Sequence, residues 1–505
     1  MTNKLKEGVA KAIFEQVKKS KENKLSKEDI ENSLTIPPNV EMGDFAFPCF
    51  KLSAVFKKSP VEIAKQLEKE IKLKGNIVKV SANNGYLNFF TDKNSEIMDL
   101  FENVGEDYGK PLSSRENAKK KIIVDFSSPN VGKPMHIGHI RSTVIGDSLI
   151  RVFDFLGYDT FGINYLGDIG LHIGKLIVAW EIWLDKKALK EDPIKELLRL
   201  YVKFCDEEKS EIKEGVDEES DLYENNEWTN KAKEKLKLIE LGDKKAHEIW
   251  KEIRVASGKG FDRVYEMLKV NFDETTGQSH FSDSGKEIIL NALKKGKAFV
   301  DETGATFVDF KDFKELGLKH ELPKKCVLRS NGTASYMTQD IGALIERYKK
   351  HKFAEIVYVT DYRQRAHFEQ LFSIVKKFGY DFLEKCKHVG FGTVNFGKEI
   401  IATREGKIIL LEDVLRKTVD KAKEEIKKRK TKGDAEAIGV GAVKYIILRN
   451  EPVKDVEFSW DVALNFEGDS GHYLQYSYAR ASSIIRKAKQ EKAKKEIKIK
   501  EIPKL

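Results

Sequence analysis

Two histidines lie three residues apart, His136 and His139, in a loop of small and polar residues that reads SSPNVGKPMHIGH from Ser127 onward. A loop that leads from a strand into a helix N-terminus favours a bound anion, because backbone N–H groups and the helix dipole point towards it. Gly138 lets a phosphate or a flat ring approach the backbone. The two imidazoles can donate hydrogen bonds to phosphate oxygens that gain charge during in-line displacement, and Lys133 adds a positive charge. These residues predict a site for phosphate chemistry.

Two other interpretations of the histidine pair are weaker. A zinc site needs third and fourth ligands at a suitable spacing, and the sequence has neither an HExxH motif nor a cysteine pair near this loop. A purely structural role would suit one histidine better than two that are surrounded by Ser, Pro, Asn, Gly and Lys. We therefore expect no protein-bound structural metal.

The loop is expected to lie at one edge of an open α/β sheet. The segment Lys121–Phe126 contains three consecutive β-branched apolar residues, as do parallel strands that are covered on both faces. A strand, a loop, a helix and a strand in this order form one half of a Rossmann-like sheet, which resumes after a helical insertion. The expected elements are helices over 140–156, 339–350 and 367–378 and strands over 158–164 and 355–360.

Composition excludes several classes of protein. The 505 residues suggest roughly three domains of about 150 residues each. With 90 Lys and Arg against 81 Asp and Glu, the net charge of +9 opposes both a disordered tail and a strongly basic architectural DNA binder. Four cysteines without a CxxC pair indicate a reducing compartment, and no signal peptide or membrane span is apparent. We expect a cytoplasmic protein that does not associate with a membrane.

The positive charge is concentrated near the C-terminus. From Leu415 to Leu505 the sequence holds 22 Lys and Arg and 14 Asp and Glu, an excess of eight out of the total of nine. A solvated helical surface in a lysine-rich protein accounts for this excess as readily as a face that meets a phosphate backbone. The charge alone does not decide between them.

The sequence resembles a known family. The histidine loop is similar to the HIGH signature of class I aminoacyl-tRNA synthetases, and its surroundings resemble the arginyl-tRNA synthetases in particular. The similar segments occur in the family's order along almost the whole chain: PPNVEMGDFAFPCF at 37–50, GYLNFF at 85–90, VDFSSPNVGKPMHIGHIRSTVIGDSLIRVFDFLGY at 124–158, NYLGDIGLHIGKL at 164–176, SYMTQDIGALIERY at 335–348, VYVTDYRQRAHFEQLF at 357–372 and LNFEGDSGHYLQYSYARASSIIRKA at 464–488.

The resemblance implies an arginine–tRNA ligase. ATP and L-arginine would form arginyl-adenylate and pyrophosphate, and the arginyl group would pass to the 3′-terminal ribose of tRNA(Arg), with Mg²⁺ accompanying ATP. The implied catalytic residues are His136, Gly138, His139 and Lys133, and Ile137 would contribute to ATP binding. Catalysis would rest on positioning and on stabilisation of charge, without a covalent enzyme intermediate.

The residue chemistry of a second segment agrees with arginine as the substrate. Tyr336 and Asp340 are four residues apart, so they share one face of a helix, where a carboxylate can pair with a planar guanidinium. The alternative interpretations are a core residue at a helix start for Tyr336 and a helix cap for Gln364. Asp125 is a possible second ligand, or it caps a loop. The resemblance implies that the following residues bind arginine: Ser128, Pro129, Asn130, His139, Tyr336, Asp340 and Gln364.

The second class I signature, the KMSKS loop, is degenerate. By position it is IATREGK at 401–407, where Glu405 stands in the place of a frequent lysine. The resemblance implies that Thr403, Arg404 and Lys407 bind ATP, with Arg404, Lys407 and Lys133 supplying the cations that the phosphates need. An exposed turn is the alternative interpretation.

We therefore expect an α/β protein with a Rossmann-like parallel-sheet catalytic domain, a helical insertion, an N-terminal α+β domain and a partial C-terminal all-α bundle. The expected limits are 1–112 for the additional tRNA-contacting domain, 113–385 for the catalytic domain with its insertion at about 186–330, 386–430 for the ATREGK loop and stem-contact region, and 431–505 for the partial anticodon-binding domain. The family's anticodon domain continues through more helices, so we expect this chain to be a truncated, split or reduced form. We expect it to be a monomer, and we expect its activity to be weak or absent unless a C-terminal fragment is supplied.

Three rival functions stay open at the level of sequence. A small-molecule nucleotidyltransferase of the same fold usually lacks tRNA-binding appendages, which the N-terminal unit and the basic C-terminal segment provide here. A non-catalytic tRNA binder is opposed by intact His136, Gly138, His139 and Asp340. The third rival is a synthetase for another amino acid such as lysine, whose ammonium group is a point charge and lacks the planar, forked guanidinium of arginine.

Overall fold

The computed structural model describes residues 2–20, 25–92, 109–110, 114–211, 226–395, 409–458 and 469–490. These residues fall into two compact units, one up to Gly109 and one that begins at Lys110. Among them, no helix is both long and apolar enough to cross a membrane. The cysteines at 49, 205, 326 and 386 are all free.

The first unit packs helices on an antiparallel sheet of order β1-β3-β2. Val9, Ile13, Phe47 and Phe89 lie in its apolar core. The unit has the expected α+β composition, and β1 is a short strand of four residues that ends in a proline. Its elements are α1 (Thr2–Val17), α2 (Lys27–Ser33), η1 (Val40–Met42), β1 (Phe45–Pro48), η2 (Cys49–Leu52), α3 (Ser53–Phe56), α4 (Pro60–Glu70), β2 (Ile77–Asn83) and β3 (Tyr86–Thr91).

The second unit is built on a five-stranded sheet of order β11-β10-β4-β5-β6, in which all pairs are parallel. Side chains of β4 alternate between two cores: Ile122 and Val124 face one, and Ile123 faces the other. This burial on both faces explains the unbroken apolar run of the predicted strand. The strands are β4 (Lys121–Asp125), β5 (Asp159–Leu166), β6 (Glu274–Gly277), β10 (Glu355–Asp361) and β11 (Cys386–Phe391).

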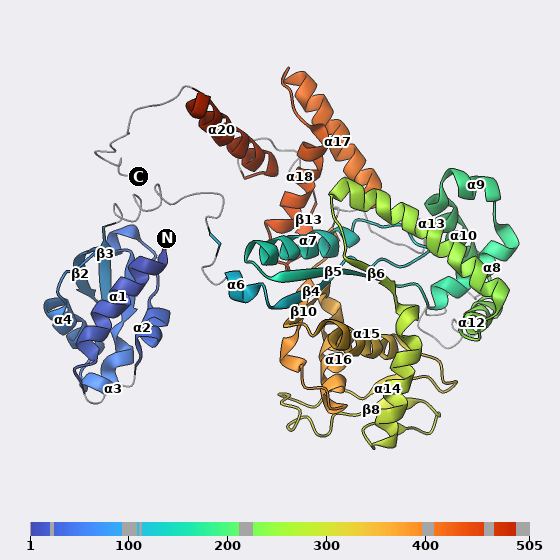
Figure 1. Cartoon of the computed structure of the whole chain (residues 1–505), viewed down its shortest axis with the longest axis horizontal. Helices are drawn as coiled ribbons and strands as arrows, with labels where there is room; N and C mark the ends of the chain where they lie inside the picture. Colours follow the sequence, from blue (N-terminus) through green and yellow to red (C-terminus); the bar gives the residue numbers. More distant parts are fainter. Residues whose placement is uncertain are drawn as a thin grey trace. The chain divides into compact units, whose positions relative to one another are not determined.

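Helices cover both faces of this sheet, with α7 on one side and α15 and α16 on the other (Figure 1). Ser335 and Thr338 form a capping box that starts α15, and Ser142 Oγ on α7 donates to the Val359 carbonyl of β10 at 2.6 Å. The helices around the sheet are α6 (Ser114–Asn117), α7 (His139–Phe155), α8 (Leu171–Trp183), α13 (Lys244–Leu268), α14 (Ser282–Lys294), α15 (Tyr336–His351), α16 (Arg365–Lys377), α17 (Leu411–Lys428), α18 (Ala435–Leu448) and α20 (Gly471–Gln490), with the short turns η3 (Gln278–Phe281), η4 (Tyr362–Gln364) and η5 (Leu383–Lys385).

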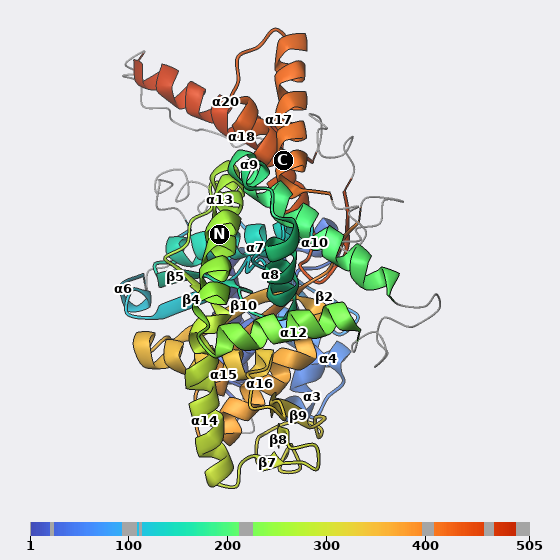
Figure 2. The same cartoon turned by 90° about the vertical axis from the view of Figure 1, so that its right-hand side faces the viewer.

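The chain between β5 and β10 contains the expected helical insertion, in which α10 lies beside α8 and α13 (Figure 2). Trp183 and Trp228 stack there with ring centroids 5.4 Å apart. The remaining elements are α9 (Lys186–Glu191), α10 (Pro193–Ser210), α12 (Glu227–Glu240), the antiparallel strands β7 (Phe299–Val300), β8 (Thr306–Val308) and β9 (Lys325–Leu328), and the parallel pair β12 (Val394–Asn395) and β13 (Val456–Glu457).

Two of the expected limits need correction. β6 lies inside the predicted insertion yet belongs to the catalytic sheet, and β11 lies beyond the predicted limit at 385. Both are edge strands, and their partly exposed side chains give no continuous apolar run that a sequence pattern would detect. The catalytic domain therefore extends at least to Phe391.

Candidate active site

The carboxyl ends of β4 and β10 open into a cleft of about 1100 Å³. In the sheet, β4 has β5 as its neighbour on one side and β10 on the other, so the strand order reverses direction at β4. The cleft therefore lies at the topological switch point, where open α/β sheets bind ligands. The cleft brings together most of the predicted site residues: Ser128, Asn130, His136, Gly138, His139, Tyr336, Asp340 and Gln364.

Three predicted residues, Pro129, Lys133 and Ile137, do not line the cleft. Ile137 is fully buried in the core, and its N–H donates to the Ile409 carbonyl at 3.1 Å. Pro129 is buried and accepts the Gly167 N–H through its carbonyl. The Lys133 ammonium lies 4.5 Å from the centroid of the Tyr201 ring. The Lys133 side chain therefore lies against α10. Thr403, Arg404 and Lys407 lie outside the described residues.

The loop after β4 has an unusual backbone. Ser127 and Ser128 both have positive φ, 70° and 50°, a region that costs a residue other than glycine about 1–3 kcal/mol. Buried hydrogen bonds offset this cost. The Ser127 N–H donates to Ser142 Oγ at 2.8 Å, and its hydroxyl lies 2.9 Å from the Tyr265 hydroxyl. The Ser128 N–H donates to Asn164 Oδ1 at 3.1 Å. The loop is thus held in one conformation before any ligand binds.

The backbone also sets the tautomer of one of the two histidines. The Gly138 N–H donates to His136 Nδ1 at 3.0 Å, and the His136 N–H donates to His139 Nδ1 at 3.1 Å. His136 Nδ1 is therefore an acceptor, and the neutral ring carries its proton on Nε2, whereas His139 Nδ1 also lies 3.3 Å from the His136 carbonyl oxygen, so either of its ring nitrogens can carry the proton. Burial lowers the pKa of His136 to about 4, with Lys133 acting in the same direction, and lowers the pKa of His139 to about 3, with His136 adding to the effect. At neutral pH both imidazoles are therefore uncharged, and His136 is an Nε2–H donor.

Gly138 has a steric reason to be glycine. A Cβ atom built at this position would lie 2.8 Å from His136 Cε1 and 2.9 Å from His136 Nδ1. Any side chain would push the imidazole out of place and break the bond to its Nδ1. The glycine between the two histidines therefore keeps His136 in position as well as the backbone open.

The opposite wall of the cleft comes from α15 and α16. Tyr336 is the first residue of α15 and is 51% exposed, so it is not a core residue at the helix start. Asp340 follows one turn later, and its Oδ2 lies 2.7 Å from His367 Nε2. Gln364 occupies the position before α16 without a side-chain capping bond, which removes the helix-cap interpretation.

Asp125 already has a partner. Its Oδ2 accepts from Arg347 Nη1 at 2.6 Å in a pair that is almost fully buried, and its Oδ1 accepts from Ser128 Oγ at 3.1 Å. Burial raises the pKa of the Asp125 carboxyl, and Arg347 opposes this shift. The Arg347 guanidinium stacks 4.6 Å from the Tyr165 ring centroid, while its Nε and Nη2 have no hydrogen-bond partner.

Sequence reasoning missed Arg347 and His367. Arg347 lies seven residues after Asp340, two helical turns along the same face, and this spacing was a usable signal. His367 gave none, because it approaches Asp340 from a different helix. Among the described residues, no group of three or more histidines, cysteines and acidic residues is arranged to hold a metal ion.

The parallel sheet, the switch-point cleft and the histidine loop that enters α7 define the catalytic domain of a class I aminoacyl-tRNA synthetase. Residues 107–460 match the family described as tRNA synthetases class I (R), catalytic domain. Residues 3–91 match the family described as Arginyl tRNA synthetase N terminal domain. The chain belongs to the arginyl-tRNA synthetase family, as the sequence resemblance predicted, and ATP is a substrate of the class.

Individual relatives agree with this assignment. The chain is 39% identical over 486 residues to the arginine–tRNA ligase of Clostridioides difficile, covering 94% of this chain and 81% of that protein. Its fold is similar to the arginyl-tRNA synthetase of Thermus thermophilus, with a TM-score of 0.72 and 23% identity over 96% of this chain and 82% of that one. The fold is also similar to the arginyl-tRNA synthetase of Plasmodium falciparum, with a TM-score of 0.71 and 24% sequence identity. That match covers 96% of this chain and 81% of the other.

Proposed function

We propose that this cleft activates L-arginine with ATP and that the chain then charges tRNA(Arg). The observation that carries the proposal is the meeting, in one switch-point cleft, of two neutral histidine donors with a tyrosine and a carboxylate on the facing helix. The first group suits phosphates that gain charge, and the second suits a guanidinium. A pocket for a shorter cation would not need a planar partner beside the carboxylate.

In the first step, a carboxylate oxygen of arginine attacks the α-phosphorus of ATP, the bond to the β-phosphate oxygen breaks, and pyrophosphate leaves. The Nε2–H groups of His136 and His139 would donate to phosphate oxygens as they gain negative charge. The His136 proton does not have to move, because the backbone already sets the tautomer of this ring. Mg²⁺ would accompany the ATP phosphates, as it commonly does in such sites.

In the second step, a hydroxyl of the 3′-terminal ribose of tRNA(Arg) attacks the arginyl carbonyl carbon and AMP leaves. Asp340 would hold the substrate guanidinium with Tyr336 beside it, and Asn130 and Gln364 would hold the amino and carboxyl end. Asp125 is occupied by Arg347, so we assign the direct charge contact to Asp340 alone.

We further infer that the N-terminal unit and the basic segment after Leu415 contact tRNA, and that the chain acts as a cytoplasmic monomer.

Pyrophosphate exchange with a panel of amino acids tests this assignment. Exchange should require arginine and should fail with lysine and with citrulline, which keeps the shape of arginine but lacks its charge. The reaction is run with and without tRNA(Arg), since arginyl enzymes typically need the tRNA bound. Equal exchange with citrulline would refute the role of Asp340, and exchange with lysine alone would refute the choice of substrate.

A further inference from the structure

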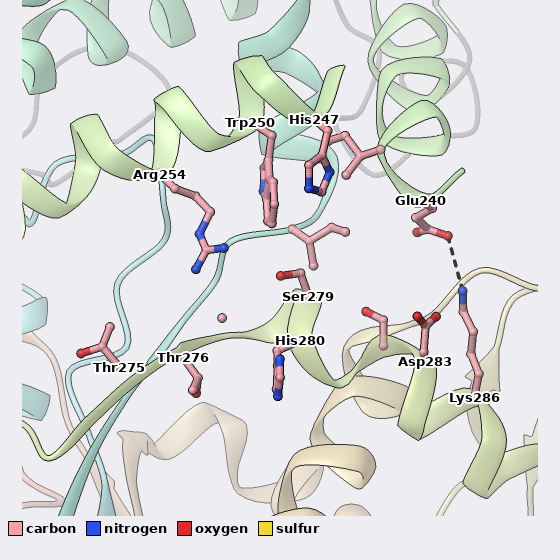
Figure 3. Close-up of a pocket in the computed structure, with 14 residues that line it drawn as sticks. Glu240, His247, Trp250, Arg254, Thr275, Thr276, Ser279, His280, Asp283 and Lys286 are labelled. Atoms are coloured by element: carbon pink, nitrogen blue, oxygen red, sulfur yellow. Dashed lines mark ion pairs between the residues drawn. The ribbon is translucent and has the colours of Figure 1, made fainter. Parts of the chain in front are cut away.

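A second cavity, of about 500 Å³, shares no lining residue with the catalytic cleft. Helix α13 forms one side of it, and η3 and the start of α14 form the other. Figure 3 shows His247, Trp250 and Arg254 pointing into it from α13, with Ser279 facing them. The proposed reaction uses none of these residues, so the polar groups gathered here need another explanation.

The Arg254 guanidinium is held in place by buried neighbours. Its Nε lies 3.4 Å from Asp168 Oδ2, and its Cζ lies 4.8 Å from the centroid of the Trp250 ring. Asp168 is fully buried and is itself fixed, because it accepts from the Ser279 N–H at 2.9 Å and the Ser279 hydroxyl at 2.7 Å. The Trp250 indole N–H donates to the Asp168 carbonyl at 2.7 Å. Both groups that orient the guanidinium are therefore rigid.

The η nitrogens of Arg254 make no hydrogen bond with any residue that the structure describes. A guanidinium that is oriented by an ion pair at Nε and by an indole ring, with its η edge open towards a cavity, presents a fork for two oxygens of a phosphate or carboxylate. A lysine in this position would offer a point charge without that geometry. One end of the cavity therefore offers a binding group for an anion.

The rest of the cavity offers a ring surface and further polar atoms. The His247 ring lies 4.7 Å from the Trp250 ring, and its Nδ1 is buried without a hydrogen-bond partner. At the end away from Arg254, Glu240 and Lys286 are 3.8 Å apart, too far for a hydrogen bond, and Asp283 lies beside them (Figure 3). A ligand that paired these groups would remove the cost of leaving His247 Nδ1 unsatisfied.

We propose that this cavity binds a purine nucleoside monophosphate. The phosphate would sit on the Arg254 fork, the base would lie along His247 and Trp250, and the N–H groups of the base would reach the Glu240 and Asp283 carboxylates. This class combines an oxyanion, a planar ring and N–H donors at the end remote from the oxyanion, in the order in which the cavity presents their partners. A volume of about 500 Å³ is within the usual range for ligands of this size.

Equilibrium dialysis of radiolabelled GMP and AMP against the full chain tests the proposal. A non-hydrolysable arginyl-adenylate analogue, arginyl-sulfamoyl-adenosine, fills the catalytic cleft during the measurement. At least one of the two nucleotides should bind at one site per chain, and guanosine or adenosine without the phosphate, and ribose 5-phosphate without the base, should each bind at least 10-fold more weakly.

Arg254→Lys should weaken nucleotide binding at least 10-fold, because it keeps the charge and the ion pair with Asp168 but removes the fork. Lys245→Gln, on the same helix and paired with Glu181 at 2.9 Å outside the cavity, is the matched control and should bind as the unaltered chain does. His247→Phe preserves the ring and removes the nitrogen, and its several-fold weaker binding serves as a second readout if Arg254→Lys melts early.

Three results would overturn the proposal: no binding of GMP or AMP, inorganic phosphate binding as tightly as the nucleotides, or unchanged binding by both Arg254→Lys and His247→Phe. His139→Ala separates this proposal from the proposed function. It should lose arginine activation and keep the second-site binding, so either proposal can fail while the other holds.

Discussion

The two walls of the catalytic cleft are built in different ways. The loop wall, residues 125–142, is mostly buried, its backbone carries two serines with positive φ, and its histidine rings accept hydrogen bonds from backbone N–H groups. The helix wall, made by Tyr336, Asp340 and Gln364 of α15 and η4, is more open, with Tyr336 half exposed and Gln364 making no capping bond. The loop wall is rigid before a ligand arrives, whereas the helix wall leaves its polar groups available to the ligand. Loss of a histidine from the loop wall should therefore appear in kcat, and damage to the helix wall in the KM for arginine.

The largest effect should come from the loop wall. His139→Ala should lower kcat for arginyl-adenylate formation about 10²–10³-fold with little change in the KM for arginine, because it removes one preorganised donor to a developing charge. Pyrophosphate exchange at saturating arginine measures it, and a melting curve confirms folding. Charging at the rate of the unaltered enzyme would remove the histidine from catalysis.

The helix wall gives the next largest effect. Asp340→Asn should raise the KM for arginine about 10–100-fold, the value of a charge-assisted hydrogen bond, while kcat stays within a few fold. A steady-state arginine titration at saturating ATP measures it, and the KM for ATP is the control. A fall in kcat with an unchanged arginine KM would show that the two walls do not divide the work in this way.

His367 sharpens the comparison, because it contacts no substrate in the proposed pose but fixes Asp340 through a 2.7 Å hydrogen bond. His367→Ala should raise the arginine KM about 3–10-fold, the worth of a neutral hydrogen bond, and His367→Gln should restore part of the loss. The same titration measures both variants. If alanine and glutamine behave alike, the contact has no positioning role.

The smallest expected effect is an absence of titration in the loop wall. Burial lowers the pKa of His136 to about 4 and of His139 to about 3, so both rings should stay neutral as the pH falls from 8 to 5. In the unfolded chain these histidines bind protons near pH 6.5, so the folded state loses stability as the pH falls from about 6.5 towards 4. Carbon-detected NMR of ¹³C-labelled histidine follows the rings directly. A midpoint near 6.5 for either residue would contradict the burial that holds the loop.

The sequence predicted the backbone elements on either side of the histidine loop. Local patterns sufficed for β4 and α7, because an apolar strand, a glycine-containing loop and an amphipathic helix follow one another directly. Edge strands β6 and β11 were missed since their exposed faces break the apolar run. Long-range contacts were also missed: the Arg347–Asp125 and His367–Asp340 pairs join elements that are distant in the chain or lie on different helices.

The side-chain directions of the loop were beyond a sequence pattern as well. Ile137 and Lys133 stand among residues that line the cleft, yet one enters the core and the other lies over Tyr201. Motif membership identifies a segment, and only the backbone conformation decides which of its residues face the ligand. Residues 401–407, with Thr403, Arg404 and Lys407, stay a prediction.

The position of β4 in the middle of the sheet has a consequence for how the enzyme is made. One neighbour of β4 in the sheet, β5, follows it closely in the chain, but the other neighbour of β4, β10, begins only at Glu355. At synthesis rates of about 5–20 residues per second, the chain between Asp125 and Glu355 takes roughly 10–50 s to emerge from the ribosome. During that time the nascent protein carries the histidine loop beside an unpaired strand edge. A ribosome that stalls before residue 336 would release a chain that has the histidine loop but neither Tyr336 nor Asp340, and so has no groups to select arginine.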